Sequence, residues 1–441
     1  MKKIRLAIVG ATGVVGRTAL KVLEEKKLPI DEYVLFASSH SSGKKIKFMD
    51  RDYIVQELNY LSFDSGFDYA IFSAGSSTSK KYAPIAASKG CIVIDNSSAF
   101  RMDPQVPLVV PEVNPEEIQN NHGIIANPNC STIQAVVALK PLDDKYKIKR
   151  IVYSTYQAVS GAGRNGILDL ENGIKNYVTD KAYFDSQYYD ANCIESFDGS
   201  QYKKKYDSSQ YSDCKSIRNT SFVVDFSEIG KVSYPLAKFN YPIFSNCIPH
   251  IDDFLENGYT KEEEKMINET RKILKRQDLK ITATTVRVPV FNSHSESINV
   301  EFEKTYEMED LINTLANSSG IILQDNLLSS YRKNSNAIAE NKIDKFNDSV
   351  VPENESDKFN DSNVVRENKA DKFNSCTPKE PTYPLAVYAS GHDEVFVGRI
   401  RRDDSVASGV NLWVVADNIR KGAASNAVQI LEKCLEQKGR S

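Results

Sequence analysis

The stretch KIRLAIVGATGVVGRTALKVLEEKK at residues 3–27 indicates the class of the fold. Its first part is a short apolar run that ends at Gly10. The second part carries apolar side chains near helical spacing, namely Val14, Val15, Ala19, Val22 and Leu23. A strand, a glycine turn and a helix in this order are typical of the start of a doubly wound α/β domain.

The residues that follow repeat this alternation. Runs typical of buried strands lie at 32–38, 68–74, 91–97 and 123–127, and a helical stretch lies at 79–90. Strands that alternate with helices in this way predict a mainly parallel sheet.

The turn after the first strand is rich in glycine. GATGVVG places Gly10, Gly13 and Gly16 between the predicted strand and the predicted helix. A tight turn needs glycine, and the free amides of a helix N-terminus suit a pyrophosphate. The spacing G-x-x-G-x-x-G departs from the commoner G-x-G-x-x-G, and a plain glycine-rich turn is the alternative. The flanking strand and helix favour a dinucleotide site.

The pattern changes from about residue 148. The run 148–161 is typical of a strand, and apolar residues alternate in 282–290 and in 296–304. Because a short loop joins the last two runs, we expect them to be antiparallel neighbours in an α+β domain. The chain ends in a predicted strand and an amphipathic helix.

A helix is predicted at 260–276, where Thr260 and Glu263 form a capping box. Four charged residues share one face of it and would ordinarily form a solvated stripe of ion pairs: Glu262, Lys265, Glu269 and Lys272.

Composition limits the classes of function. The formal net charge of -3 argues against a nucleic-acid partner, and no stretch approaches the length of a membrane span. The N-terminus reaches turn glycines before a signal-peptide apolar region develops. Seven scattered cysteines without a Cys-x-x-Cys pair indicate reduced thiols and no metal site. We expect a soluble, cytoplasmic protein.

Two regions look like insertions. Residues 183–233 are rich in Tyr, Ser, Asp and Lys, and residues 340–375 contain DKFN three times in a polar context. The second region cannot bury enough apolar surface to offset chain entropy, so we expect a disordered surface segment. The alternative is a docking segment that uses the repeated Phe346, Phe359 and Phe373.

Cys130 in NPNCST (127–132) precedes a predicted helix at 131–142. A thiol at a helix N-terminus has a lowered pKa, and the free amides there can hold an oxyanion. Asn129 is able to add a side-chain donor. A buried cap residue is an equally good interpretation of these residues alone.

Arg287 and His294 are further candidates. In an extended strand Arg287 lies on the face opposite Val286 and Val288, so we expect it to point out of the local core. Its planar guanidinium suits a carboxylate, and a histidine near a thiol is the usual acid/base partner. Taken singly, a surface ion pair and an incidental histidine are the favoured alternatives.

Six motifs occur in one order: GATGVVG, SSAFRMDPQVPLVVPEVN, NPNCSTIQ, STYQAVSGAG, VRVPVFNSHSE and NLWVVADNIRKGAA. With these motifs the chain resembles the aspartate-β-semialdehyde dehydrogenase family over nearly everything except the two insertions. The resemblance implies the reversible, NADPH-dependent reductive dephosphorylation of L-4-aspartyl phosphate to L-aspartate 4-semialdehyde. This reaction lies on the route to lysine, threonine, methionine and diaminopimelate.

The resemblance also implies roles for individual residues. Cys130 is the nucleophile that forms a thioester, and His294 is its acid/base partner. The substrate is bound by Gln157, Arg287, Asn129 and Glu262. Its phosphate is bound by Arg101 and Lys265. Cofactor contacts fall on Gly10, Thr12, Gly13, Val14, Val15, Gly16, Ser38, His40, Ser41, Ser160, Gly161 and Asn418.

The resemblance further implies two domains and a homodimer. A Rossmann-like NADP-binding domain is expected at 1–128, completed by a C-terminal helix at 411–441. A catalytic and dimerisation domain of α+β type with a mixed sheet is expected at 129–410.

One motif departs from the family. Residues 38–44 read SSHSSGK, with His40 where the family usually has an arginine that helps hold the 2′-phosphate of NADP. Because neutral histidine is a poorer phosphate partner than guanidinium, we expect NADP with weakened discrimination, helped by Ser38, Ser41 and Lys44.

Two other functions remain open. N-acetyl-γ-glutamyl-phosphate reductase shares the reaction type, but its cysteine motif is closer to NPGCY. The other is a non-catalytic descendant disrupted by the insertions.

Overall fold

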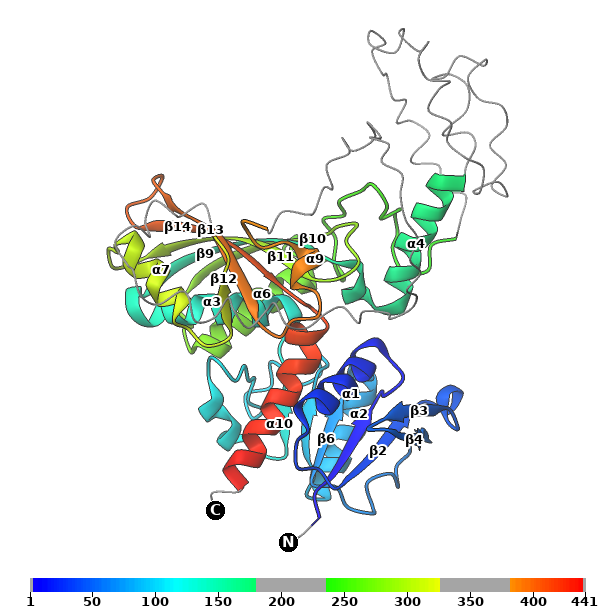
Figure 1. The fold of residues 1–441 in the computed structure, drawn as a ribbon. Coiled ribbons are helices and arrows are strands. Elements are labelled where there is room, and N and C mark those ends of the chain that lie inside the picture. Colours follow the sequence, from blue (N-terminus) through cyan, green and yellow to red (C-terminus); the bar gives the residue numbers. More distant parts are fainter. Residues whose placement is uncertain (1–2, 180–234, 326–380, 439–441) are drawn as a thin grey trace, which may run out of the picture.

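The computed structural model describes residues 3–179, 235–325 and 381–438. They form two domains, each built around a six-stranded sheet (Figure 1). The insertions expected at 183–233 and 340–375 lie outside the described residues. None of the helices in the described ranges has the length and apolar character that crossing a membrane requires.

The sheet of the first domain is parallel throughout, as predicted. Its strand order is β5-β2-β1-β6-β7-β8. The strands are β1 (Arg5–Val9), β2 (Glu32–Ala37), β5 (Gln56–Glu57), β6 (Tyr69–Phe72), β7 (Ile92–Asp95) and β8 (Ile124–Ala126). A small hairpin, β3 (Lys45–Phe48) and β4 (Arg51–Ile54), lies beside this sheet.

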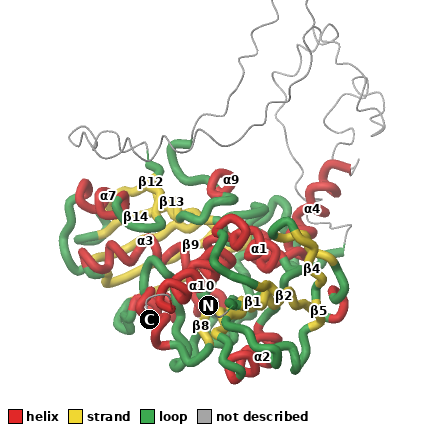
Figure 2. The backbone as a smooth tube through the Cα atoms, turned by 60° about the horizontal axis from the view of Figure 1, so that its bottom comes forward, coloured by secondary structure: helices red, strands yellow, loops and turns green. Residues whose placement is uncertain are grey.

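Helices cover both faces of this sheet. Helices α1 (Val14–Lys26) and α10 (Ser425–Lys438) share one core cluster with the strands, and α2 (Ser76–Ser88) belongs to the cluster on the other side. Figure 2 shows β1 and β2 between these two helical layers. As the sequence predicts, β1 is a short apolar run that is buried on both faces, and after the glycine turn the apolar side chains of α1 follow helical spacing.

The end of the chain forms the predicted strand and helix, but the strand belongs to the second sheet, so the segment 411–441 does not complete the first domain as a whole. Its first residues belong to β14 (Gly409–Ala416), a strand of the second sheet, and α10 begins only at Ser425. The β-branched run VNLWVVA explains the strand, because such residues pack well on a pleated surface.

The second sheet is mixed, with the order β10-β9-β11-β14-β13-β12. Besides β14, its strands are β9 (Ile148–Gln157), β10 (Lys280–Arg287), β11 (His294–Phe302), β12 (Ile321–Leu323) and β13 (Val395–Asp403). β10 is parallel to β9 and β12 is parallel to β13, whereas the other neighbours are antiparallel.

The expectation that 282–290 and 296–304 are neighbours is wrong, because β9 lies between β10 and β11. The connection passes the end of β9, where the N–H of Val159 donates to Val290 O at 2.8 Å and the N–H of Ser160 donates to Phe291 O at 3.2 Å. These bonds hold the loop 288–293 against the start of the segment after β9.

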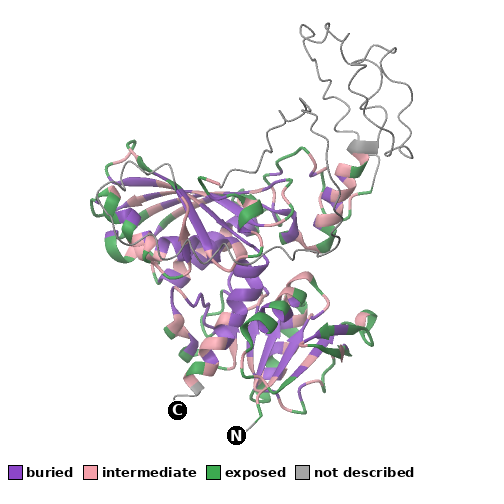
Figure 3. Cartoon of the chain, in the orientation of Figure 1, coloured by how far each residue is buried: buried purple, intermediate pink, exposed green. Residues whose placement is uncertain are grey.

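Three helices pack on one face of the second sheet: α3 (Cys130–Tyr146), α6 (Lys261–Leu274) and α7 (Met308–Ala316). Ile298, Val300 and Phe302 of β11 enter this core, which the alternation predicted. The capping box of Thr260 and Glu263 is present at the start of α6. Figure 3 shows that the strands of both sheets are mainly buried.

The domains meet at a π-helical turn, Arg420–Ala424, which leads into α10. Arg420 pairs with Glu25 of α1 at 2.6 Å, and Lys421, which is fully buried, pairs with Glu112 at 2.7 Å. Charged side chains of the π-helical turn thus connect two parts of the first domain, at Glu25 and at Glu112, where this domain meets the second.

Candidate active site

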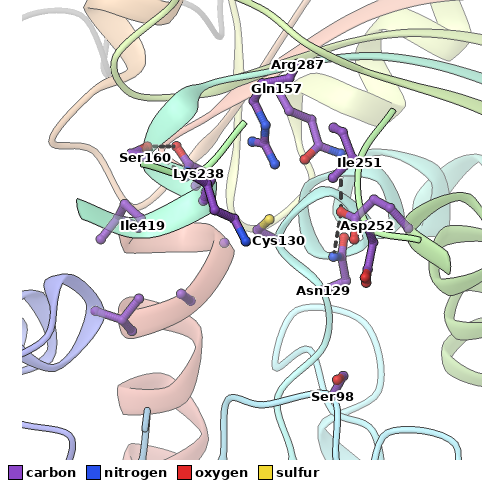
Figure 4. Close-up of a pocket in the computed structure, with 18 of the residues that line it drawn as sticks. Ser98, Asn129, Cys130, Gln157, Ser160, Lys238, Ile251, Asp252, Arg287 and Ile419 are labelled. Carbon is purple, nitrogen blue, oxygen red and sulfur yellow. Dashed lines mark hydrogen bonds between the residues drawn. The ribbon is translucent and has the colours of Figure 1, made fainter. Parts of the chain in front are cut away.

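A cavity of ≈ 870 Å³ lies between the two domains. Its wall includes Gly13, Val14 and Val15 of the first domain, and Cys130 and Arg287 of the second. Figure 4 shows Cys130, Arg287 and Gln157 around one space, and the sulfur atom of Cys130 faces this space. The cavity therefore connects the glycine loop to the candidate nucleophile.

The glycine loop makes a close backbone crossing. Gly10 has φ 87°, and a Cβ on Gly16 would lie 2.1 Å from Gly10 O. Gly13 is the N-cap of α1 and has no side chain to satisfy the amides of the first helical turn. Those amides lack partners inside the helix, so the end of α1 at Val14 and Val15 fits a pyrophosphate.

Other predicted cofactor residues fall into two groups. Ser160, Gly161 and Asn418 line the cavity, and Asn418 Nδ2 donates to Ser160 Oγ at 3.0 Å. Ser38, His40 and Ser41 instead lie at an exposed turn after β2 and do not line the cavity. The hydroxyls of Thr12 and Ser41, 3.4 Å apart, connect this turn to the glycine loop.

Cys130 is the first residue of α3, and Asn129 is its N-cap. Asn129 Oδ1 accepts from the N–H groups of Ser131 at 3.0 Å and Thr132 at 3.3 Å. Asn129 Nδ2 donates to Glu262 at 2.9 Å. Asn129 is therefore the cap residue, and the adjacent Cys130 remains the candidate nucleophile. The side-chain amide of Asn129, expected to donate to an oxyanion, donates instead to the carboxylate of Glu262.

The environment of the thiol is not the one expected from the helix start. Burial raises the pKa of Cys130 to about 12, and the nearby Glu262 adds to this effect. Arg287, Arg101 and the N–H of Ser131 lower this pKa but do not outweigh burial. The expected lowering of the pKa is thus absent, and the resting sulfur is a neutral thiol.

His294 is fully buried at the start of β11. Burial lowers its pKa well below the ordinary value, and the charge of Arg287 acts in the same direction. The N–H of Ala158 donates to Nδ1 at 3.0 Å, so the proton of the neutral ring is on Nε2. Nε2 has no hydrogen-bond partner among the described residues.

Arg287 points into the cavity, which corrects the expectation that it points away from the core. The buried residues of β10 are Ala283, Thr285 and Arg287, so the face expected to be outside faces α6 and the site. Its NH1 donates to Ala158 O at 2.6 Å. A Cβ on Gly161 would lie 2.9 Å from this NH1 and 3.2 Å from His294 Nε2. Gly161 therefore leaves both groups accessible.

Glu262 is the centre of a buried polar network. It accepts from Asn129, from Gln157 Nε2 at 3.3 Å and from Lys265 Nζ at 3.3 Å. Lys265 also donates to Asp252 at 2.6 Å. Burial lowers the pKa of Lys265, but Glu262 and Asp252 outweigh this effect and the pKa is raised. Lys265 is thus a paired cation in this structure.

Arg101 lines the cavity with a guanidinium that is held on three sides. Nε donates to Asn127 O at 2.9 Å, NH2 to Asn96 O at 3.0 Å, and NH1 to Glu269 at 3.2 Å. Each terminal nitrogen keeps one further N–H that has no hydrogen-bond partner among the described residues. These two donors suit an oxyanion in the cavity.

Glu269 was assigned to a solvated stripe, and this expectation is wrong. Its side chain is 1% exposed, and Oε2 accepts from the N–H of Asn129 at 2.6 Å while Oε1 holds Arg101. Burial raises its pKa, against the opposing charge of Arg101. Only partners distant in sequence reveal this role, so the helical pattern gave no signal for it.

Gly422 and Lys238 are among the cavity residues that were not predicted. Gly422 lies in the π-helical turn, where a Cβ would be 2.8 Å from the Cβ of Cys130. Lys238 lies in the segment between α4 and α6 and lines the cavity itself. For Gly422 the glycine in NIRKGAA was a visible signal, because an isolated glycine in a helical pattern often marks close packing.

Comparisons with known proteins agree with this architecture. The family description "Semialdehyde dehydrogenase, NAD binding domain" matches residues 5–121, and "Semialdehyde dehydrogenase, dimerisation domain" matches residues 139–343 and 362–421. Aspartate-semialdehyde dehydrogenase of Aquifex aeolicus is 44% identical over 435 residues, covering 98% of each chain. The Bacillus subtilis enzyme is 38% identical over 432 residues, covering 97% of this chain and 96% of its own.

Solved structures give the same result. The crystal structure of aspartate semialdehyde dehydrogenase II from Vibrio cholerae matches with a TM-score of 0.70 and 37% identity, covering 99% of each chain. A second structure of that enzyme, complexed with ASA, matches equally well. The glycine loop and the mixed second sheet agree with these relatives, which match the chain over nearly their full length. The chain therefore belongs to the aspartate-semialdehyde dehydrogenase family.

Proposed function

We propose that the protein catalyses the reversible, NADPH-dependent reductive dephosphorylation of L-4-aspartyl phosphate to L-aspartate 4-semialdehyde. One observation carries the proposal: Cys130 begins a helix inside a cavity that continues to the glycine loop. The family membership supports the same reaction. The product serves the synthesis of lysine, threonine, methionine and diaminopimelate.

Cys130 is the nucleophile in this proposal. In the oxidative direction Sγ bonds to the aldehyde carbon and the thiol proton passes to the aldehyde oxygen, which gives a tetrahedral hemithioacetal. A bound nicotinamide nucleotide would supply the hydride acceptor for this carbon, and the hydroxyl proton leaves to solvent as the carbonyl of the thioester forms. The resulting thioester is attacked by phosphate, the carbon–sulfur bond breaks, and the sulfur is released as the leaving group. The reductive direction uses the same bonds in reverse.

His294 serves the oxygen of the tetrahedral adduct. Because Nδ1 accepts from Ala158, the Nε2–H is the group available toward the cavity. We propose that it donates to this oxygen as negative charge develops, which stabilises the adduct in both directions. Accepting a proton on Nε2 would require the Ala158 contact to open, so the donor role fits this geometry best.

The substrate's amino-acid end is matched by opposite charges. Arg287 suits the α-carboxylate, and Glu262 suits the free ammonium group, with Gln157 and Asn129 holding Glu262 in place. An acetylated amine carries no positive charge, so it would offer the buried Glu262 no ion pair. This favours aspartate semialdehyde over an N-acetylglutamyl substrate.

The phosphate is proposed to bind at Arg101, which keeps two further donors and lines the same cavity as Cys130. Lys265 joins it when the substrate displaces part of its contact with Asp252 or Glu262.

NADP is the proposed cofactor. The residues that would hold it are the loop Gly10, Thr12, Gly13, Val14, Val15 and Gly16, the turn with Ser38, His40 and Ser41, and the cavity residues Ser160, Gly161 and Asn418. The protein is proposed to act as a homodimer, since it matches a dimerisation domain. Its proposed location is the cytoplasm.

The test uses the purified full chain with NADP, phosphate and either aspartate semialdehyde or N-acetylglutamate semialdehyde. We expect nicotinamide reduction with aspartate semialdehyde only, and a loss of at least about 10⁴-fold in Cys130→Ala. Turnover of the acetylated substrate would support the reductase alternative. Absence of turnover with both would support a non-catalytic protein.

A further inference from the structure

A short segment, residues 235–241, crosses the cavity wall and is here called the strap. Its backbone is fixed by Asp169 of α4 (Gly163–Thr179), which is fully buried. The carboxylate accepts from the N–H groups of Ala237 at 2.6 Å, Lys238 at 2.8 Å and Phe239 at 3.0 Å. Three bonds to consecutive amides set the position of the strap, although Lys238 itself is exposed.

The side chain of Lys238 extends from the strap into the cavity. Figure 4 shows its ammonium group directed toward the side of Cys130, and both residues line the same cavity. No carboxylate of the described residues forms an ion pair with it. Lys238 is thus a cation held at the cavity without a neutralising partner in the described part of the chain.

The other cations of the substrate end are already balanced. Lys265 contacts two carboxylates, Asp252 and Glu262, and Arg101 is paired with Glu269. Arg287 is proposed to hold the α-carboxylate. A phosphate near neutral pH carries more than one negative charge, so binding it beside a buried sulfur requires positive charge that these pairs do not supply.

We infer that Lys238 binds the phosphate that attacks, or leaves from, the acyl group on Cys130. The inference rests on the proposed function. The long, flexible lysine stem lets the ammonium follow a group that changes from free phosphate to acyl phosphate. The phosphates of the nucleotide have the same chemistry, and the experiment distinguishes the two sources.

The test is steady-state kinetics of Lys238→Met in the oxidative direction, with each substrate varied in turn. We expect the KM for phosphate to rise about 10-fold, as for the loss of one charge-assisted contact, while the KM values for semialdehyde and NADP stay unchanged. Lys238→Arg, which keeps the charge, should recover most of the phosphate affinity. Because the residue is exposed, folding should be unaffected.

A second measurement separates this inference from the proposed function. Mixing enzyme, NADP and semialdehyde without phosphate should give a stoichiometric burst of NADPH from thioester formation, equal in wild type and Lys238→Met. Lack of the burst in the wild type would refute the proposed function and with it this inference. A normal burst with an unchanged phosphate KM in Lys238→Met would refute the inference alone.

Two further outcomes bear on the source of the phosphate and on net charge. A rise in the KM for NADP only would overturn the inference, since Lys238 would then serve the nucleotide. Lys21→Met removes one positive charge from α1, where the side chain is 70% exposed, and should leave all constants unchanged. An equal rise in the phosphate KM in Lys21→Met would also overturn it.

Discussion

In the first domain the cofactor loop is made of backbone, whereas in the second domain the substrate end is made of buried side chains. Gly10, Gly13 and Gly16 contribute no side-chain groups, and the helix start at Val14 offers amides. Around Cys130, by contrast, Glu262 and Glu269 are buried. Residues of both regions line the same cavity, among them Gly13 and Val14 of the first and Glu262 of the second.

Because of this difference, the two regions should tolerate different kinds of substitution. A backbone site depends on space, so only substitutions that fill a close approach should damage it. A side-chain site in a low-dielectric environment depends on balanced charge, so removing one partner leaves another group unpaired. The following predictions test each half of this statement.

The largest effect is expected for Gly16→Val. A Cβ there would lie 2.1 Å from Gly10 O, so the loop must shift and the amide positions are lost. We expect the affinity for NADP to fall by at least about 100-fold, measured by nucleotide titration, with unfolding followed by calorimetry as a check. The matched control is Gly13→Ala, whose Cβ would meet Gly10 O only at 3.4 Å. Equal losses in both variants would contradict the steric explanation.

A loss of about 100-fold in kcat is expected for Glu269→Ala. The change removes the acceptor of the Asn129 N–H and the anchor of Arg101, so both the nucleophile and the phosphate donors lose their positions. Breaking this buried pair should also lower the free energy of unfolding by about 3 kcal/mol.

Two variants of α6 show whether positioning is the cause. Glu269→Gln keeps an acceptor for Asn129 and should recover part of kcat. Glu264→Ala lies on the same helix outside this network, pairing with Asn257 and Asn268, and should have little effect on kcat. A Glu269→Gln variant as inactive as Glu269→Ala would show that the charge, not the acceptor, is what matters.

The fold followed from the sequence where the determinants are local. The alternation of strands and helices predicted the parallel sheet, and the capping box predicted the start of α6. The strand order of the second sheet was not predictable in this way, because β9 enters between β10 and β11 from far away in the chain. Hydrophobic periodicity specifies a face of a strand and not its neighbour.

The site shows the same division. The residues around Cys130 were indicated by motifs, but the burial of Glu269 depends on Arg101, which is 168 residues away. The sign of the pKa shift of Cys130 was missed for a related reason. The helix start is visible in the sequence, whereas the desolvation that outweighs it arises only from tertiary packing.

That desolvation predicts a pH dependence. With the pKa of Cys130 raised to about 12, the thiolate fraction grows with pH throughout the neutral and moderately alkaline range. We expect kcat/KM for the semialdehyde to rise by up to about 10-fold per pH unit between about pH 7 and 9. The pKa of His294 lies well below 6.5, so its neutral form persists over this range. A plateau already reached at pH 7 would show that the helix start dominates over burial.

The smallest effect is expected at the exposed turn after β2, where the first domain uses a side chain. His40 lies beside Ser41, whose hydroxyl is 3.4 Å from Thr12 of the glycine loop and 3.5 Å from Lys44 Nζ. A guanidinium at position 40 offers a fixed charge and paired donors, which match the charged oxygens of a 2′-phosphate better than the single neutral oxygen of a 2′-hydroxyl. His40→Arg should therefore raise the ratio of kcat/KM for NADP over NAD by about 3- to 10-fold, mainly through the KM for NADP. His40→Gln, which is neutral, is the control and should leave the ratio nearly unchanged. Because the turn is exposed and water screens the contact, the gain should shrink in high salt, and a salt-independent gain would mean that shape rather than charge discriminates the two nucleotides.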